Sequence, residues 1–111
     1  MFTSTPLLAW LIFLAAAIFE VGGDAVIRQG LRGGRPMLLS LSCVMLAGYG
    51  VAVNLVPWDF SKLLGVYVAF FTLISLLASR FLWQEAIPAS TWLGFLLIVA
   101  GSAIIQFADK A

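Results

Sequence analysis

The chain has 111 residues, of which 63% are hydrophobic and 10% are charged, with a formal net charge of +1 and a mean hydropathy of +1.11. Soluble domains carry about 25% charged residues, and a fold of this length has too little interior for so much apolar surface, so the composition predicts an integral membrane protein. The near-neutral charge argues against a nucleic-acid-binding surface, and a single Cys without any His excludes an intrachain disulfide and a His/Cys metal cluster.

Four long apolar segments follow one another, over residues 6–28, 37–56, 62–83 and 88–108. Each can cross about 30 Å of hydrocarbon as a helix, and none shows the alternation of a transmembrane β-strand. The short connections predict that neighbouring helices run antiparallel. We therefore expect an all-α integral membrane protein, with residues 1–111 forming one domain of four transmembrane helices.

The first segment opens with helix-start signals and has no basic region before it. Residues 3–5 are Thr, Ser and Thr, a predicted N-cap before a proline in the first turn, and the segment is expected to be retained rather than cleaved as a signal peptide. It is expected to end in a glycine- and arginine-rich loop over residues 30–36.

Basic residues are more frequent on one side of the predicted bundle. Loops one and three and their flanks carry four arginines, and the opposite side carries two lysines: Arg28, Arg32, Arg35 and Arg80, against Lys62 and Lys110. The positive-inside rule then favours cytoplasmic loops one and three with both termini outside. The bias is small, so insertion in both orientations stays open.

Three charged residues share one face of the first segment. Glu20, Asp24 and Arg28 fall within about 80° of arc on a helix. A carboxylate near the middle of a bilayer costs at least about 2.5 kcal/mol, and by default such a residue indicates a functional site. The two carboxylates resist ionising together, so their titrations should be coupled.

The economical assignment pairs Asp24 with Arg28, four residues on, and leaves Glu20 to exchange protons. The alternative is that Arg28 reaches the membrane surface, Asp24 follows it, and Glu20 only bonds a neighbouring helix. Both carboxylates are retained as candidates for binding protons or substrate.

Further residues are candidates for lining a substrate cavity. A glycine there would permit close approach, and an asparagine hints at a polar cavity. Aromatic side chains would offer a π-rich wall to a cation, although they could equally contact lipid. These candidates are Trp10, Gly23, Arg28, Asn54, Tyr67 and Phe70.

The fourth segment repeats small residues at Gly94, Gly101 and Ala108, a seven-residue spacing that suits a seam between helices. We favour an oligomer contact there, and the alternative is a wall of the substrate cavity. Four helices with one central acid cannot easily enclose a substrate and open to both sides, and transporters usually achieve this with two related halves. A homodimer, packed along this seam, is therefore expected.

The setting Glu20-Val21-Gly22-Gly23, followed by Arg28 in a chain of this length with four spans, resembles the small multidrug resistance family of the drug/metabolite transporter superfamily. In that family the first-span Glu binds proton and substrate alternately in an antiparallel homodimer, and the fourth span supports dimerisation. The resemblance implies this role for Glu20. Residues 65–72 keep Tyr67 of the family's third span but lack its Trp and paired glycines, and Asp24 is a further departure.

The C-terminal half, over residues 81–87, 92–94 and 100–101, looks more like the general superfamily repeat. It is also similar to four-span flippase subunits that move aminoarabinose-linked polyprenyl lipids.

The leading hypothesis is therefore a proton-coupled exporter of a small organic cation in the inner cell membrane, needing no cofactor. One alternative is a flippase or flippase subunit for a lipid-linked sugar or other amphiphile, in which Asp24 and Arg28 meet the headgroup. The other is a membrane subunit that stabilises a partner without transport. An enzyme is not expected, because no nucleophile–base or metal constellation is present.

Overall fold

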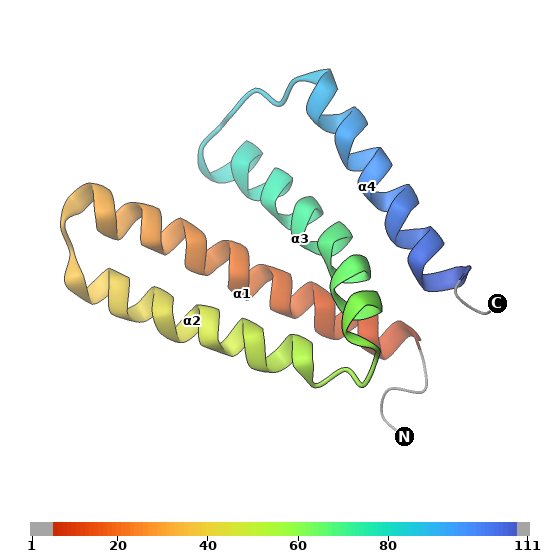
Figure 1. The fold of residues 1–111 in the computed structure, drawn as a ribbon. Helices are drawn as coiled ribbons and strands as arrows, with labels where there is room; N and C mark the ends of the chain where they lie inside the picture. Colours follow the sequence, from red (N-terminus) through yellow and green to blue (C-terminus); the bar gives the residue numbers. More distant parts are fainter. Residues whose placement is uncertain (1–5, 109–111) are drawn as a thin grey trace. The chain divides into compact units, whose positions relative to one another are not determined.

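The computed structural model describes residues 6–108, with side chains from residue 7 onward. These residues form four α-helices joined by short connections (Figure 1). The chain divides between Pro57 and Trp58 into two compact units, each a hairpin of two helices, and each is described by itself. The expected all-α fold is confirmed. The predicted N-cap at residues 3–5 lies outside the described residues.

The first hairpin consists of α1, Pro6–Gly33, and α2, Pro36–Asn54. The helix α1 ends in a Schellman turn, in which Gly34 has a φ of +62° and the Arg35 backbone N–H donates to the Gly30 carbonyl at 2.9 Å. Only glycine adopts that backbone conformation without strain, so Gly34 stops the helix.

The prediction of a loop over residues 30–33 is wrong, because these residues continue α1 for another turn beyond Arg28. The physical reason is packing between the helices. A methyl group built on Gly30 would lie 3.0 Å from Leu39 Cδ2, so the missing side chain of Gly30 lets the two helices approach next to the turn. The predicted start of the first helix at residue 6 matches the observed one, and the remaining predicted boundaries differ from the observed ones by one or two residues.

The same kind of contact continues along the seam of this hairpin, where glycines meet side chains of the other helix. A methyl group on Gly23 would lie 2.8 Å from Leu46 Cδ2, and one on Gly22 would lie 3.0 Å from Met45 Cε. Further along, the Phe19 ring packs against Gly48 of α2, where a methyl group built on Gly48 would lie 3.2 Å from Phe19 Cδ2. Glycines thus allow close helix packing in an apolar environment, where van der Waals contact is a main source of association.

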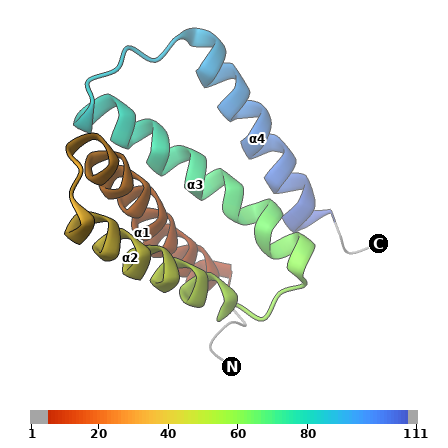
Figure 2. The same cartoon turned by 60° about the vertical axis from the view of Figure 1, so that its left-hand side comes forward.

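The second hairpin consists of α3, Phe60–Leu82, and α4, Ala89–Phe107, which lie side by side in Figures 1 and 2. The Ser102 hydroxyl donates a 2.6 Å hydrogen bond to the Gly65 carbonyl across the two helices. At the same level a methyl group on Gly65 would lie 2.6 Å from Ile105 Cδ1. The absence of a side chain at Gly65 therefore exposes its carbonyl to α4 and makes room for Ile105.

Polar contacts mark the ends of α3. At its start the Lys62 ammonium lies 4.6 Å from the centre of the Trp58 ring, a cation–π arrangement of two residues that both favour the membrane surface. After its end, Gln84 takes a φ of 53°, and the Glu85 N–H donates to the Ser79 carbonyl at 3.0 Å.

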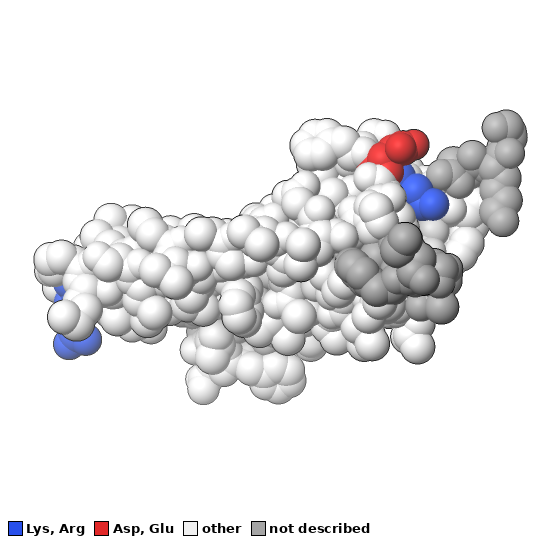
Figure 3. All heavy atoms as spheres, turned by 90° about the horizontal axis from the view of Figure 1, so that it is seen from below, with Lys and Arg blue, Asp and Glu red and all other residues white. Residues whose placement is uncertain are grey.

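All four described helices are long and apolar enough to cross a membrane. Large apolar side chains stand exposed on each of them, for example Leu11, Val44, Phe81 and Leu97. Most of the surface seen in Figure 3 is uncharged, with blue and red atoms confined to small groups. Such a surface is stable in hydrocarbon, where backbone polar groups are satisfied within the helices.

Candidate functional site

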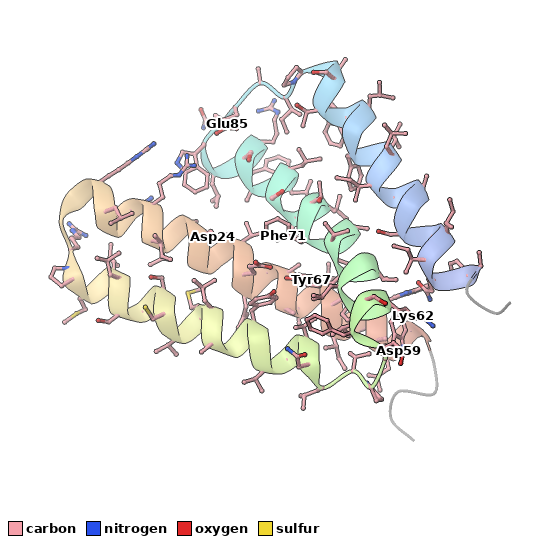
Figure 4. All side chains as sticks on the ribbon, in the orientation of Figure 1. Asp24, Asp59, Lys62, Tyr67, Phe71 and Glu85 are labelled. Carbon is pink, nitrogen blue, oxygen red and sulfur yellow. The ribbon has the colours of Figure 1, made fainter. Side chains whose placement is uncertain are left out.

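The charged face of α1 begins at the middle of the helix and extends toward its C-terminal end. The midpoint of Pro6–Gly33 falls between Phe19 and Glu20. The side chain of Glu20 is half-buried, whereas Asp24 and Arg28 are exposed. The labelled Asp24 projects from the middle part of α1 in Figure 4. The structure therefore keeps these three residues on one face, with each step of four residues advancing about 6 Å along the axis.

The pair of glycines that follows Glu20 belongs to the helix seam. Gly23 is buried against Leu46, and Gly22 faces Met45. The helix that approaches closely at these glycines is thus α2 of the same chain. Participation of Gly23 in a substrate cavity stays a prediction.

Tyr49 of α2 joins this site, although it is not among the residues predicted from the sequence. Its side chain is half-buried, and its hydroxyl lies within electrostatic range of the carboxylates of Glu20 and Asp24. Tyr49 comes four residues after Met45 and three after Leu46, so it shares their face of α2. One signal could have found it: Tyr49 follows the tight turn at Gly34 by about as many residues as Glu20 precedes it.

Two other predicted cavity residues of this hairpin lie apart from Glu20. Trp10 is half-buried ten residues earlier on α1, which is about 15 Å along the axis. Asn54 is exposed, and its side-chain amide donates a 2.8 Å hydrogen bond to the Gly50 carbonyl of its own helix. The face of α2 that carries Asn54 and Gly50 has open space beside it, since nothing lies within 4 Å of a methyl group built on Gly50.

Two of the aromatic candidates, Tyr67 and Phe70, belong to the second hairpin. Tyr67 is buried and Phe70 is half-buried on α3. The Tyr67 ring lies 6.5 Å from that of Phe71, centre to centre, and both residues are labelled in Figure 4. Their contribution to a substrate cavity stays a prediction.

The predicted dimer seam lies on α4. Nothing lies within 4 Å of a methyl group built on Gly94 or on Gly101, so this strip of α4 is open. Ala108 follows the last residue of the helix, and its N–H donates to the Ile104 carbonyl at 2.9 Å. The seam itself stays a prediction.

The chemistry available at the α1–α2 site follows from these residues. It offers two carboxylates, one guanidinium and one phenol on adjacent helix faces, so it can exchange protons, pair with a cation and donate a hydrogen bond. Among the described residues, no three His, Cys, Asp or Glu side chains are grouped so that they could hold a metal ion.

Comparison with known proteins agrees with this architecture. The family described as "Uncharacterised BCR, YnfA/UPF0060 family" matches residues 7–111. A UPF0060 membrane protein of Streptomyces avermitilis is 32% identical over 89% of this chain and 90% of its own length. A UPF0060 membrane protein of Halalkalibacterium halodurans is 29% identical over 93% of this chain and 97% of its own length. One from a Synechocystis strain is 24% identical over 91% of this chain and 94% of its own length.

No solved structure matches the chain significantly. The family match spans nearly the whole sequence, its members are described as membrane proteins, and the described helices can cross a membrane. The chain is therefore a multi-pass membrane protein that belongs to the YnfA/UPF0060 family.

Proposed function

We propose that this protein is a proton-coupled antiporter that exports a small organic cation across the inner cell membrane. Glu20 binds a proton and the substrate alternately. One observation carries the proposal: a half-buried carboxylate sits at the midpoint of the long apolar helix α1. An ionised carboxylate at that depth costs free energy, and this cost is reduced when a proton and a cation neutralise the charge in turn.

The neighbouring charges support this assignment. Asp24 lies one turn further on, and Arg28 one turn beyond Asp24, in the orientation that favours an ion pair between these two. Of the two carboxylates, Glu20 is the one nearest the midpoint of α1, and we assign the substrate cation to it. The resemblance to the small multidrug resistance family supports the same role for Glu20.

The working unit in this proposal is a homodimer. Two copies supply two related halves, which alternating access needs, and the open strip of α4 at Gly94 and Gly101 offers a surface for close contact. The dimer can be parallel or antiparallel. An antiparallel dimer would require insertion in both orientations, which the small arginine bias permits.

The test is proton release from weakly buffered, detergent-solubilised protein when organic cations are added. The panel covers guanidinium compounds, quaternary ammoniums and polyamines. The chain has two glutamates, so the matched variants are Glu20→Gln, and Glu85→Gln in the exposed connection between α3 and α4. We expect release from the wild type and from the Glu85 variant, and its loss in the Glu20 variant.

Folded protein that releases no protons with any compound would refute export of these cations. A second function then becomes the leading one, because the exposed guanidinium of Arg28 beside Asp24 could meet a phosphate or zwitterionic headgroup. A lipid-linked sugar flippase predicts movement of labelled lipid in proteoliposomes that depends on Arg28. If purified protein moves neither cations nor lipids and Glu20→Gln alters assembly, the chain is a non-transporting partner subunit.

A further inference from the structure

The seam of the first hairpin brings Glu20 and Tyr49 to the same level. Gly23 of α1 faces Leu46 of α2, in contact so close that a methyl group on Gly23 would lie 2.8 Å from Leu46 Cδ2. In an antiparallel pair, three residues back on one helix correspond to three residues forward on the other. Glu20 is three residues before Gly23, and Tyr49 is three residues after Leu46.

A second contact has the same register: a methyl group on Gly30 would lie 3.0 Å from Leu39 Cδ2, seven residues further along α1 and seven residues back along α2. Near the level of Glu20 itself, the Phe19 ring packs on Gly48, two residues away from this register. Gly48 has no side chain between the ring and the helix, so α2 approaches α1 closely just where Tyr49 is half-buried. The phenol of Tyr49 therefore lies next to a close helix contact, at about the level of Glu20 on α1.

The charges around Glu20 are few. On α1 they are Asp24 and Arg28, and on α2, Pro36–Asn54, there is no Asp, Glu, Lys, Arg or His. The other titratable side chain of α2, Cys43, is exposed and lies about 120° around the helix from Tyr49. Tyr49 is thus the hydrogen-bond donor that α2 brings to this site, and its hydroxyl interacts electrostatically with both carboxylates, more strongly with Glu20.

We propose that Tyr49 is a positioning residue, whose hydroxyl donates a hydrogen bond to the ionised carboxylate of Glu20 from across the helix seam. The inference rests on the proposed function in one respect, because it makes this bond part of how Glu20 exchanges its proton for a cation. A hydrogen bond to a charged acceptor is stronger than one between neutral groups, and it favours the ionised form. Tyr49 therefore stabilises the charged form of the Glu20 side chain, and it holds the carboxylate on the side of α2.

The direct test is a titration of Glu20 itself in the full-length protein. With selective ¹³C labelling of Glu carboxyl carbons, the chain gives two signals, from Glu20 and Glu85, and Glu20→Gln identifies them. Tyr49→Phe removes the hydroxyl and keeps the ring. We expect the midpoint of the Glu20 titration to move to higher pH by roughly one unit, since a bond that favours the ionised form is lost.

Two controls separate this effect from a general disturbance of the fold. The Glu85 signal, from an exposed residue in the other hairpin, should titrate at the same pH in every variant. Cys43→Ala changes an exposed side chain on another face of α2 and should leave the Glu20 midpoint in place. A Glu20 midpoint that is the same in wild type and Tyr49→Phe, or a Glu20 signal that titrates in neither, overturns the inference.

Cation-induced proton release then distinguishes the two proposals. If wild-type protein releases protons through Glu20, while Tyr49→Phe leaves both the titration and the release unchanged, the Tyr49 inference fails alone. If the titration shifts as expected but no cation releases protons from the wild type, the hydrogen bond stands and the exporter proposal fails.

Discussion

The contact between Gly23 and Leu46 gives a quantitative prediction about the first hairpin. A methyl group on Gly23 would lie 2.8 Å from Leu46 Cδ2 and 2.9 Å from Leu46 Cγ, with Met45 Cβ at 3.5 Å beside them. Carbon atoms pack at about 3.5–4.0 Å, so the helices must separate by roughly 0.6–1.2 Å or the leucine must leave its position. Rotating the end of the leucine moves Cδ2 but not the branch carbon Cγ, so a small rearrangement does not relieve the overlap.

Gly23→Ala should therefore destabilise the protein by overpacking, which costs about 1–3 kcal/mol. Alanine also favours a helix over glycine by about 1 kcal/mol, which would hide part of this loss. Gly50→Ala provides the matched control, because it gains the same helix preference in α2 where nothing lies within 4 Å of the added methyl group. The difference between the two variants isolates the packing cost.

The assay is reversible unfolding in mixed micelles with increasing SDS, followed by tryptophan fluorescence at fixed protein concentration. We expect Gly23→Ala to be less stable than Gly50→Ala by about 1–3 kcal/mol. Leu46→Ala in the Gly23→Ala background should recover part of the loss, seen as a favourable coupling energy in a double-mutant cycle. Equal stability of the two alanine variants, within about 0.5 kcal/mol, would refute the close seam.

Two further predictions concern the second hairpin and the orientation of the chain. Ser102→Ala removes the 2.6 Å hydrogen bond to the Gly65 carbonyl and should cost about 0.6–1.5 kcal/mol in the same unfolding assay. Ser75→Ala, whose hydroxyl bonds within its own helix, should cost less, and an equal loss would contradict the interhelical role. Replacing Arg32 and Arg35 by Ala removes two of the basic residues at the α1–α2 turn, so a C-terminal reporter should be found more often on the cytoplasmic side. An unchanged distribution would show that these arginines do not set the orientation.

The α1–α2 turn shows where prediction from the sequence fails. The density of glycine and arginine over residues 30–36 is typical of a loop, yet α1 continues to Gly33. The glycine that weakens a helix in isolation is here the residue that lets Leu39 approach. Local preference was therefore overridden by a contact with the other helix.

The candidate site likewise contains one residue that the sequence predicts and one that only the structure reveals. Glu20 is found from the sequence because the cost of a carboxylate in hydrocarbon depends on its depth in one helix. Tyr49 is not found that way, because its relation to Glu20 depends on the register of two helices. Asn54, by contrast, is polar in the sequence, and only the structure shows that its amide is satisfied by the carbonyl of Gly50 in its own helix.

By itself the sequence determined that this is a membrane protein with four spans and an acid at the centre of the first. Hydrocarbon requires backbone polar groups to be satisfied within each helix, so each span can be recognised from its own stretch of sequence as a continuous apolar run. The tertiary structure decided which faces of the helices meet, that Gly23 and Gly65 serve close packing, and that Tyr49 joins the charged face. Those outcomes depend on the shapes of side chains that are distant in the sequence, because van der Waals fit and interhelical hydrogen bonds largely select helix partners in lipid.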